Sequence, residues 1–174
     1  MAREAFAGNY TAPILVLSLG QSGRGSQGFG PAVLSELAQR YPYAGGLVEF
    51  VDGGADGLEL LHLFKGRQTI VVLDAISGGQ ARGGVEVLEG VEVLRYANGD
   101  SAPTHAGDAH ELLSTAAFLG ELPEHTYIVG LEPPVTGNNA ISSKAPQQEL
   151  QSAIERAQGI IDRWLVELSE PVTA

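Results

Sequence analysis

The chain has 174 residues, of which 44% are hydrophobic, so it is long enough and apolar enough to form one domain around a single core. Its formal net charge is −11 with only ten Lys and Arg residues, which argues against nucleic acid or anionic membranes as partners and favours a basic protein or peptide. It contains no cysteine, which excludes disulfides, thiolate metal ligands and a cysteine nucleophile.

We expect no signal peptide in this sequence. Residues 1–12 lack the long apolar core of a signal peptide. No apolar stretch approaches the roughly 20 residues that cross a bilayer. We therefore expect a soluble, cytoplasmic protein with a flexible N-terminus over residues 1–12, a single domain over 13–168 and a C-terminal tail over 169–174.

The first half of the chain alternates between strand and helix patterns. The aliphatic run at 14–19 predicts a strand buried on both faces, and a glycine-rich loop follows it. Pro31 fits a first helical residue, and the apolar positions after it have helical spacing. Strands are predicted at 47–51 and 69–75, with a short helix at 56–64 between them. This alternation indicates a parallel α/β core with right-handed crossovers.

The second half begins with a segment that breaks this alternation. Residues 76–84 have no helical period and are too few for a parallel crossover, so the alternating segment 85–96 is predicted to be an antiparallel edge strand. Helices are predicted at 106–119 and 146–168, with a last strand at 126–131. The expected fold is a three-layer α/β/α sandwich around a mixed five-stranded sheet with one antiparallel edge strand.

Three polar residues are candidates for a site at the carboxyl ends of the strands, where open α/β sheets bind their ligands. Gln27 lies in the loop after the first strand, Asp74 ends the third strand, and His105 precedes a helix. The segment 97–106 can span roughly 30 Å when extended, enough to bring His105 back to this rim. A helix N-terminus favours neutral imidazole, the form that binds metal. Each residue taken alone also fits a capping or solvent-exposed role.

Two other site types find weaker support in the glycine loop. Gly23, Gly25 and Gly28 match the spacing of a dinucleotide-binding fingerprint, with Asp52 as the ribose acceptor, although the long approach to the helix does not suit a tight pyrophosphate turn. Ser22 lies outside the register of a nucleophile elbow, which argues against a serine hydrolase.

Several segments together resemble the [NiFe]-hydrogenase maturation endopeptidases over residues 13–168. The most specific is "DGGADGLELL" at 52–61, and "ILVLSLG", "IVVLDAI" and "FLGELPEHTYIVGLEP" occur in the family's order and spacing. The resemblance implies a mixed five-stranded, phosphorylase/hydrolase-like fold. It also implies an endopeptidase that removes the C-terminal extension of the hydrogenase large-subunit precursor after nickel insertion.

The resemblance also implies roles for individual residues. In the family an acid in the first loop, an aspartate ending the third strand and a histidine before a helix touch a nickel that the substrate carries. The second and third correspond to Asp74 and His105, which become the expected catalytic residues and metal ligands. Residues expected to contact the substrate chain are Gly28, Gly30, Asp52, Gly53 and Gly54.

The first loop departs from the family pattern. Gln27 stands where the family has its metal-binding acid, and Ser26 replaces the acid before it. An amide oxygen is a weaker ligand than a carboxylate for a divalent transition metal, and an amide cannot act as a general base. The departure leaves two readings within the family, an active endopeptidase or a catalytically impaired homologue that binds the large subunit as a checkpoint chaperone. A small-molecule binder such as a dinucleotide module is the reading outside it.

Overall fold

The fold is that of a computed structural model, which describes residues 11–21, 28–77, 84–99, 108–132 and 147–170. The strands are β1 (Ile14–Ser18), β2 (Val48–Asp52), β3 (Thr69–Ala75), β4 (Val85–Glu89) and β5 (His125–Leu131). The α-helices are α1 (Phe29–Arg40), α2 (Val91–Asn98), α3 (Ala109–Leu119) and α4 (Gln147–Ser169), and a 3₁₀ helix, η2 (Gly57–Phe64), lies between β2 and β3.

The strands form one mixed sheet in the order β2-β1-β3-β5-β4. The β1–β2, β1–β3 and β3–β5 pairs are parallel, whereas β4 runs antiparallel to β5 at the sheet edge. The predicted fold class, including its antiparallel edge strand, is therefore confirmed.

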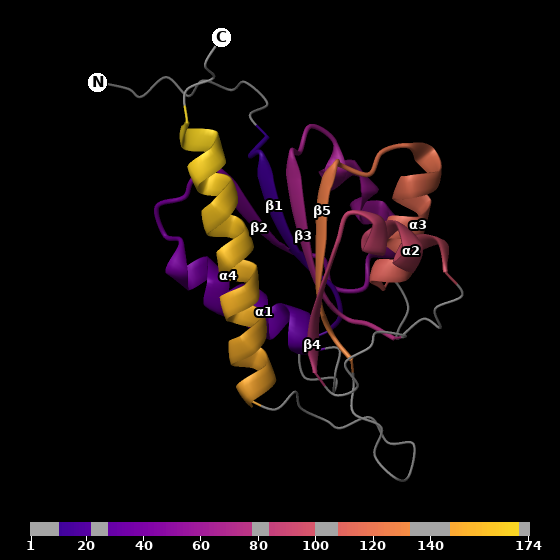
Figure 1. The fold of residues 1–174 in the computed structure, drawn as a ribbon, viewed down its shortest axis with the longest axis horizontal. Helices are drawn as coiled ribbons and strands as arrows, with labels where there is room; N and C mark the ends of the chain where they lie inside the picture. Colours follow the sequence, from indigo (N-terminus) through magenta and orange to yellow (C-terminus); the bar gives the residue numbers. More distant parts are fainter. Residues whose placement is uncertain (1–10, 22–27, 78–83, 100–107, 133–146, 171–174) are drawn as a thin grey trace.

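Helices cover both faces of this sheet, as Figure 1 shows. One face packs against α1 and α4, and the other packs against η2, α2 and α3. Because successive side chains of a strand point to opposite faces, β3 supplies Val71 and Leu73 to the first core and Ile70 and Val72 to the second. All four side chains are fully buried, as expected for central strands of a parallel sheet.

The prediction of one strand over residues 85–96 is wrong in its second half. Strand β4 ends at Glu89, and α2 begins at Val91. Between them Gly90 has φ +54°, a conformation that turns the chain and that L side chains rarely adopt. Val93, Tyr96 and Ala97 are buried and have the i, i+3, i+4 spacing of a helix face. The alternation of "VEV" on both sides of Gly90 hid this change of period.

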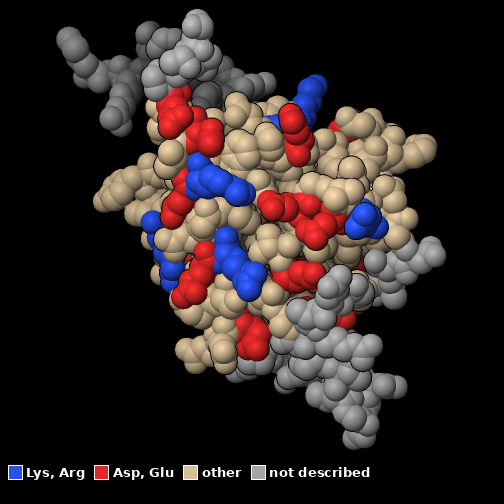
Figure 2. Space-filling model, in the orientation of Figure 1, with Lys and Arg blue, Asp and Glu red and all other residues tan. Residues whose placement is uncertain are grey.

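The surface carries charges of both signs. On the face shown in Figure 2, Lys and Arg side chains lie interspersed among Asp and Glu side chains. No helix among the residues that the structure describes is both long enough and apolar enough to span a membrane.

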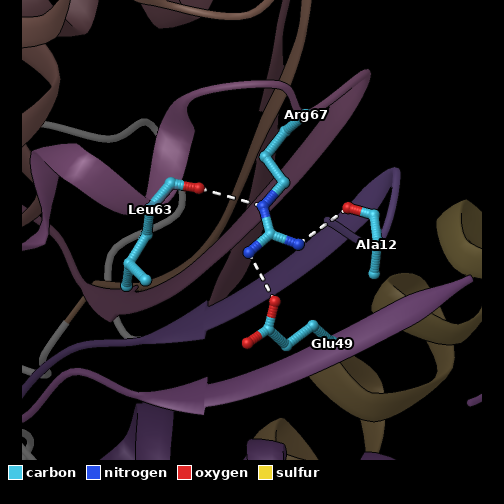
Figure 3. A network of polar contacts seen from close by, with 4 residues as sticks. All are labelled: Ala12, Glu49, Leu63 and Arg67. Atoms are coloured by element: carbon cyan, nitrogen blue, oxygen red, sulfur yellow. Dashed lines mark hydrogen bonds and ion pairs between the residues drawn. The ribbon is translucent and has the colours of Figure 1, made fainter. Parts of the chain in front are cut away.

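A buried arginine joins three elements at the amino ends of the strands (Figure 3). The Arg67 guanidinium donates to the Leu63 carbonyl of η2 at 2.9 Å and to the Ala12 carbonyl before β1 at 2.7 Å, and it pairs with the Glu49 carboxylate of β2. The Arg67 side chain is only 4% exposed, whereas that of Glu49 is 46% exposed. The rigid guanidinium fork is what allows one side chain to satisfy acceptors on three sides.

Replacing Arg67 with Ala is predicted to lower the free energy of unfolding by about 2 to 4 kcal/mol, because two partly buried carbonyl acceptors lose their donor. Arg67→Lys should recover only part of this, since one ammonium cannot reach all three acceptors. Urea unfolding of the variants measures both effects. Arg156→Ala is the matched control, because Arg156 forms its hydrogen bond to Ser152 at an exposed position. Equal losses for Arg67→Ala and Arg156→Ala would contradict the assigned role.

Candidate functional site

The order of the strands places a topological switch point beside β1. The chain leaves β1 through α1 to reach β2 on one side, and it then passes through η2 to β3 on the other side. Helix α1, which follows β1, and helices α2 and α3, which come after β3, lie on opposite faces of the sheet, so the connections diverge at the carboxyl ends of β1 and β3. This is the topological switch point at which open α/β sheets bind ligands.

Asp74 lies at this point, near the end of β3, and is fully buried. Its Oδ2 accepts the backbone N–H of Ala109, the first residue of α3, at 2.8 Å. Its Oδ1 accepts the N–H of Ala75 at 2.7 Å. Two backbone donors and the positive end of a helix dipole therefore surround a carboxylate that has no exposed surface. Such an arrangement complements negative charge through backbone donors.

Gln27 and His105, the other two predicted ligands, lie outside the described residues. Each is close in sequence to a residue at the start of α1 or α3, near the carboxyl ends of the strands. Gln27 directly precedes Gly28, the N-cap of α1, and His105 lies four residues before Ala109. Among the described residues there is no group of three or more His, Asp or Glu side chains that could hold a metal ion. The ligand set of Gln27, Asp74 and His105 stays a prediction.

A second buried carboxylate, missed by the sequence analysis, lies at the same helix end. Asp108 is 1% exposed and caps α3, where its Oδ1 accepts the N–H of Glu111 at 3.1 Å. The signal was present in the sequence, because an acid three residues after a capping side chain is the spacing of a capping box. The buried acids Asp74 and Asp108 thus lie at the first turn of one helix.

The phenol of Tyr96 on α2 lies near both acids. Burial raises the pKa of the Tyr96 phenol above its ordinary value, and the charges of Asp74 and Asp108 raise it further. The Tyr96 ring packs edge-on against His110 of α3, with ring centroids 5.7 Å apart. Helix α2, which the sequence analysis did not foresee, therefore brings Tyr96 within electrostatic reach of the two acids.

Gly30 allows α1 to begin against the carboxyl ends of β1 and β3. A Cβ at this position would lie 2.4 Å from the Leu73 carbonyl oxygen and 2.6 Å from that of Leu19, both backbone atoms. Only glycine fits such a backbone approach. Gly28, the other glycine of this loop predicted to contact substrate, is half-buried at the N-cap of α1. Substrate contact at either glycine stays a prediction.

The Asp-Gly-Gly segment after β2 is fastened to β1. Oδ1 of Asp52 accepts the Ser18 hydroxyl at 3.1 Å and the Gly54 N–H at 3.2 Å. The Gly53 N–H donates to the Ser18 carbonyl, and a Cβ at Gly53 would meet the Leu60 side chain at 2.7 Å. Gly54 has φ +55°, which favours glycine. These contacts give the residues of the Asp-Gly-Gly segment a structural role in holding the loop against β1. The contact of this segment with substrate stays a prediction.

Strand alternation separates Asp52 from Asp74. Asp52 is in register with Ser18, and by parity both side chains point to the face of α1 and α4. Asp74 points to the opposite face, under the first turn of α3. Two strand spacings, about 10 Å, also lie between their strands. The two acids therefore do not form one pair.

Two surface hollows lie at the opposite end of the sheet. One, of about 330 Å³, lies between α2, α3 and the start of β5, and another, of about 410 Å³, lies beside the end of η2 and the turn after α3. Both border Gly120, Leu122 and Pro123. They are remote from Asp74, so the candidate site does not rest on them.

Known proteins resemble this chain along most of its length. The family described as hydrogenase maturation protease, HycI, matches residues 31–164. HupD of Thiocapsa roseopersicina, a hydrogenase expression/formation protein, is 32% identical over 146 residues, which cover 83% of this chain and 65% of HupD. The hydrogenase 2 maturation protease of Escherichia coli is 34% identical over 121 residues, covering 69% of this chain and 73% of that protein.

A solved structure agrees with these sequence relatives. The hydrogenase maturating endopeptidase HybD from E. coli aligns with a TM-score of 0.65 and 25% identity, covering 86% of this chain and 92% of HybD. The chain thus spans nearly all of that structure, but slightly less than two thirds of HupD. The family match covers well over half of the chain, and we conclude that this chain belongs to the hydrogenase maturation protease family.

Proposed function

We propose that this chain is an endopeptidase that removes the C-terminal extension of a [NiFe]-hydrogenase large-subunit precursor after nickel insertion. Membership of the family supports the reaction class. The observation that carries the proposal for this chain is the Asp74 carboxylate, buried at the switch point and held by two backbone N–H groups. In this proposal nickel arrives with the substrate and is not a resident cofactor, and the reaction takes place in the cytoplasm.

Asp74 has the chemistry of both a metal ligand and a base. A carboxylate offers about four lone-pair sites, so one oxygen can accept an N–H bond and also bind a cation. Oxygen donors of this kind bind divalent first-row metals. Because both N–H donors come from the backbone, the carboxylate is oriented in the free protein before substrate arrives. We assign Asp74 the role of recognising the nickel that the substrate carries.

His105 and Gln27 are proposed to complete the site. His105 lies four residues before Ala109, so their Cα atoms are at most about 14 Å apart even if the chain between them is extended. The Ala109 N–H in turn donates to Asp74. The His105 imidazole would be a second ligand to nickel. Gln27 would contribute a neutral amide oxygen, the weakest of the three donors. With a single carboxylate among them, we propose that the substrate's own ligands supply the rest of the metal shell.

The hydrolysis itself needs one proton transfer that these residues can support. A water molecule adds to the carbonyl carbon of the scissile peptide, the C–N bond breaks, and the proton lost by the water passes to the leaving amine. Asp74 can accept and return that proton, whereas the amide of Gln27 cannot. The net charge of −11 would favour the approach of a basic tail, through long-range steering.

Incubating this chain with a nickel-loaded large-subunit precursor is predicted to shorten the precursor by its C-terminal extension. Mass spectrometry of the product measures the cut directly. A precursor assembled without nickel should stay intact under the same conditions, because the recognised metal is missing. Stable association without any cut would contradict the endopeptidase and favour the alternative of a checkpoint chaperone.

Asp74→Asn is predicted to reduce the rate of cleavage by about 100-fold or more, since the variant loses its base and anionic ligand. Both oxygens of Asp74 accept a backbone N–H. In the Asn variant one of these oxygens becomes an NH₂ group, which cannot accept that bond and faces another donor. Asp56→Asn is the matched control, because Asp56 is exposed and makes no capping bond. Single-turnover cleavage compares the two variants. A rate for Asp74→Asn within threefold of the unmodified chain would refute the role.

Gln27→Glu is predicted to accelerate cleavage by about tenfold, because a carboxylate binds divalent nickel more strongly than an amide does. Gln148→Glu, at an exposed position on α4, changes the net charge equally and should leave the rate unchanged. The measurement is kcat/KM for the nickel-loaded precursor. If both variants behaved like the unmodified chain, position 27 would not contact the metal.

A further inference from the structure

The first turn of α3 binds two buried carboxylates that the sequence separates by a strand and a helix. Asp74 accepts the N–H of the first helical residue, Ala109, at 2.8 Å. Asp108 accepts the N–H of the third, Glu111, at 3.1 Å. Their exposed fractions are 0% and 1%. One acid belongs to the proposed site, whereas the other has no role in the mechanism described above.

We propose that Asp108 is a positioning residue, which caps α3 and thereby fixes the Ala109 N–H that orients the Asp74 carboxylate. The consequence for catalysis rests on the proposed function of Asp74, whereas the mechanical coupling between the two acids does not. Asp108 does not need to touch the substrate or the metal in this arrangement.

The coupling follows from the position of Ala109 in the helix. The first N–H groups of a helix have no partner inside the helix, so their direction depends on what holds the first turn. Asp108 holds it twice, through the side-chain bond to Glu111 and through its own carbonyl, which accepts the Leu112 N–H at 3.3 Å. Without the side-chain bond the first turn frays, and the donor to Asp74 loses its fixed position.

The surroundings of Asp108 separate its capping role from its charge. The charges of Asp74 and Asp108 both raise the pKa of the Tyr96 phenol, so the two carboxylates lie close to the same side chain of α2. Like charges repel, so a charge on Asp108 gives the Asp74 carboxylate no electrostatic stabilisation. The cap needs only an acceptor oxygen, which Asn and Ser also provide.

The experiment compares Asp108→Ala with Asp108→Asn and Asp108→Ser in the full chain. Asp108→Ala should lower kcat for the nickel-loaded precursor by about tenfold while KM changes less than about twofold, because a loosened carboxylate costs geometry and leaves substrate binding intact. Asp108→Asn and Asp108→Ser should keep kcat within about threefold. Amide hydrogen exchange at Ala109 should accelerate about tenfold in Asp108→Ala, and it should stay close to the unmodified rate in the other two.

Thr126→Val is the matched control for lost stability. Thr126 is 4% exposed and donates to the Pro123 carbonyl at 2.7 Å, at the opposite end of the sheet. It should lower the unfolding temperature to a similar extent and leave both kcat and Ala109 exchange unchanged.

Three results would overturn the positioning role. Asp108→Ala with unchanged Ala109 exchange would show that the cap does not hold the donor. Asp108→Asn losing as much kcat as Asp108→Ala would assign the effect to charge. A kcat loss in Thr126→Val equal to that in Asp108→Ala would show that the loss in Asp108→Ala comes from lower stability alone. If the unmodified chain did not cleave the precursor, the proposed function would fail, and Ala109 exchange alone would still decide the coupling.

Discussion

The hydrogen bond from the Ala109 N–H to the Asp74 carboxylate links the middle of the sheet to the helix that follows His105. Asp74 is in register with Gly130 of β5, so it occupies an inner strand with neighbours on both sides. A carboxylate in such a place is stable only with donors around it, because an unpaired buried charge is costly. The first turn of α3 and the backbone at Ala75 supply them. The hydrogen bond to Asp74 therefore helps to fix the position of the first turn of α3 on the sheet.

The same rim depends on glycines that let backbones approach each other. Gly30 places the start of α1 against the Leu73 carbonyl, one residue from Asp74. Gly53 lets the loop after β2 close over Leu60 and Ser18. As a result two helix N-termini, those of α1 and α3, meet the carboxyl end of β3 from opposite faces. The donors to Asp74 that the described residues supply all come from the backbone, which suits the proposal that this acid binds a cation.

Much of the fold could be predicted from local patterns, because buried central strands and amphipathic helices have strong periodicities. The runs at β1 and β3 and the apolar face of α4 were all placed within one or two residues of their observed bounds. Helix α2 was missed because Gly90, with its positive φ, switches the period inside a continuous alternating sequence. The position of Asp74 near the carboxyl end of β3 was predicted correctly, because it directly follows a buried apolar run. Such local patterns could not reveal Asp108 or Tyr96, since their proximity to Asp74 is set by how α2 and α3 pack on the sheet.

The central claim is that Asp74 and its partners bind the nickel that the precursor already holds. Nickel-edge X-ray absorption of the complex between the nickel-loaded precursor and this chain tests it directly, without relying on turnover. Complex formation is predicted to add oxygen or nitrogen ligands at about 2 Å to the nickel shell, and an Asp74→Ala variant is predicted to remove at least one of them. A nickel shell that is identical in the free precursor and in both complexes would contradict the account.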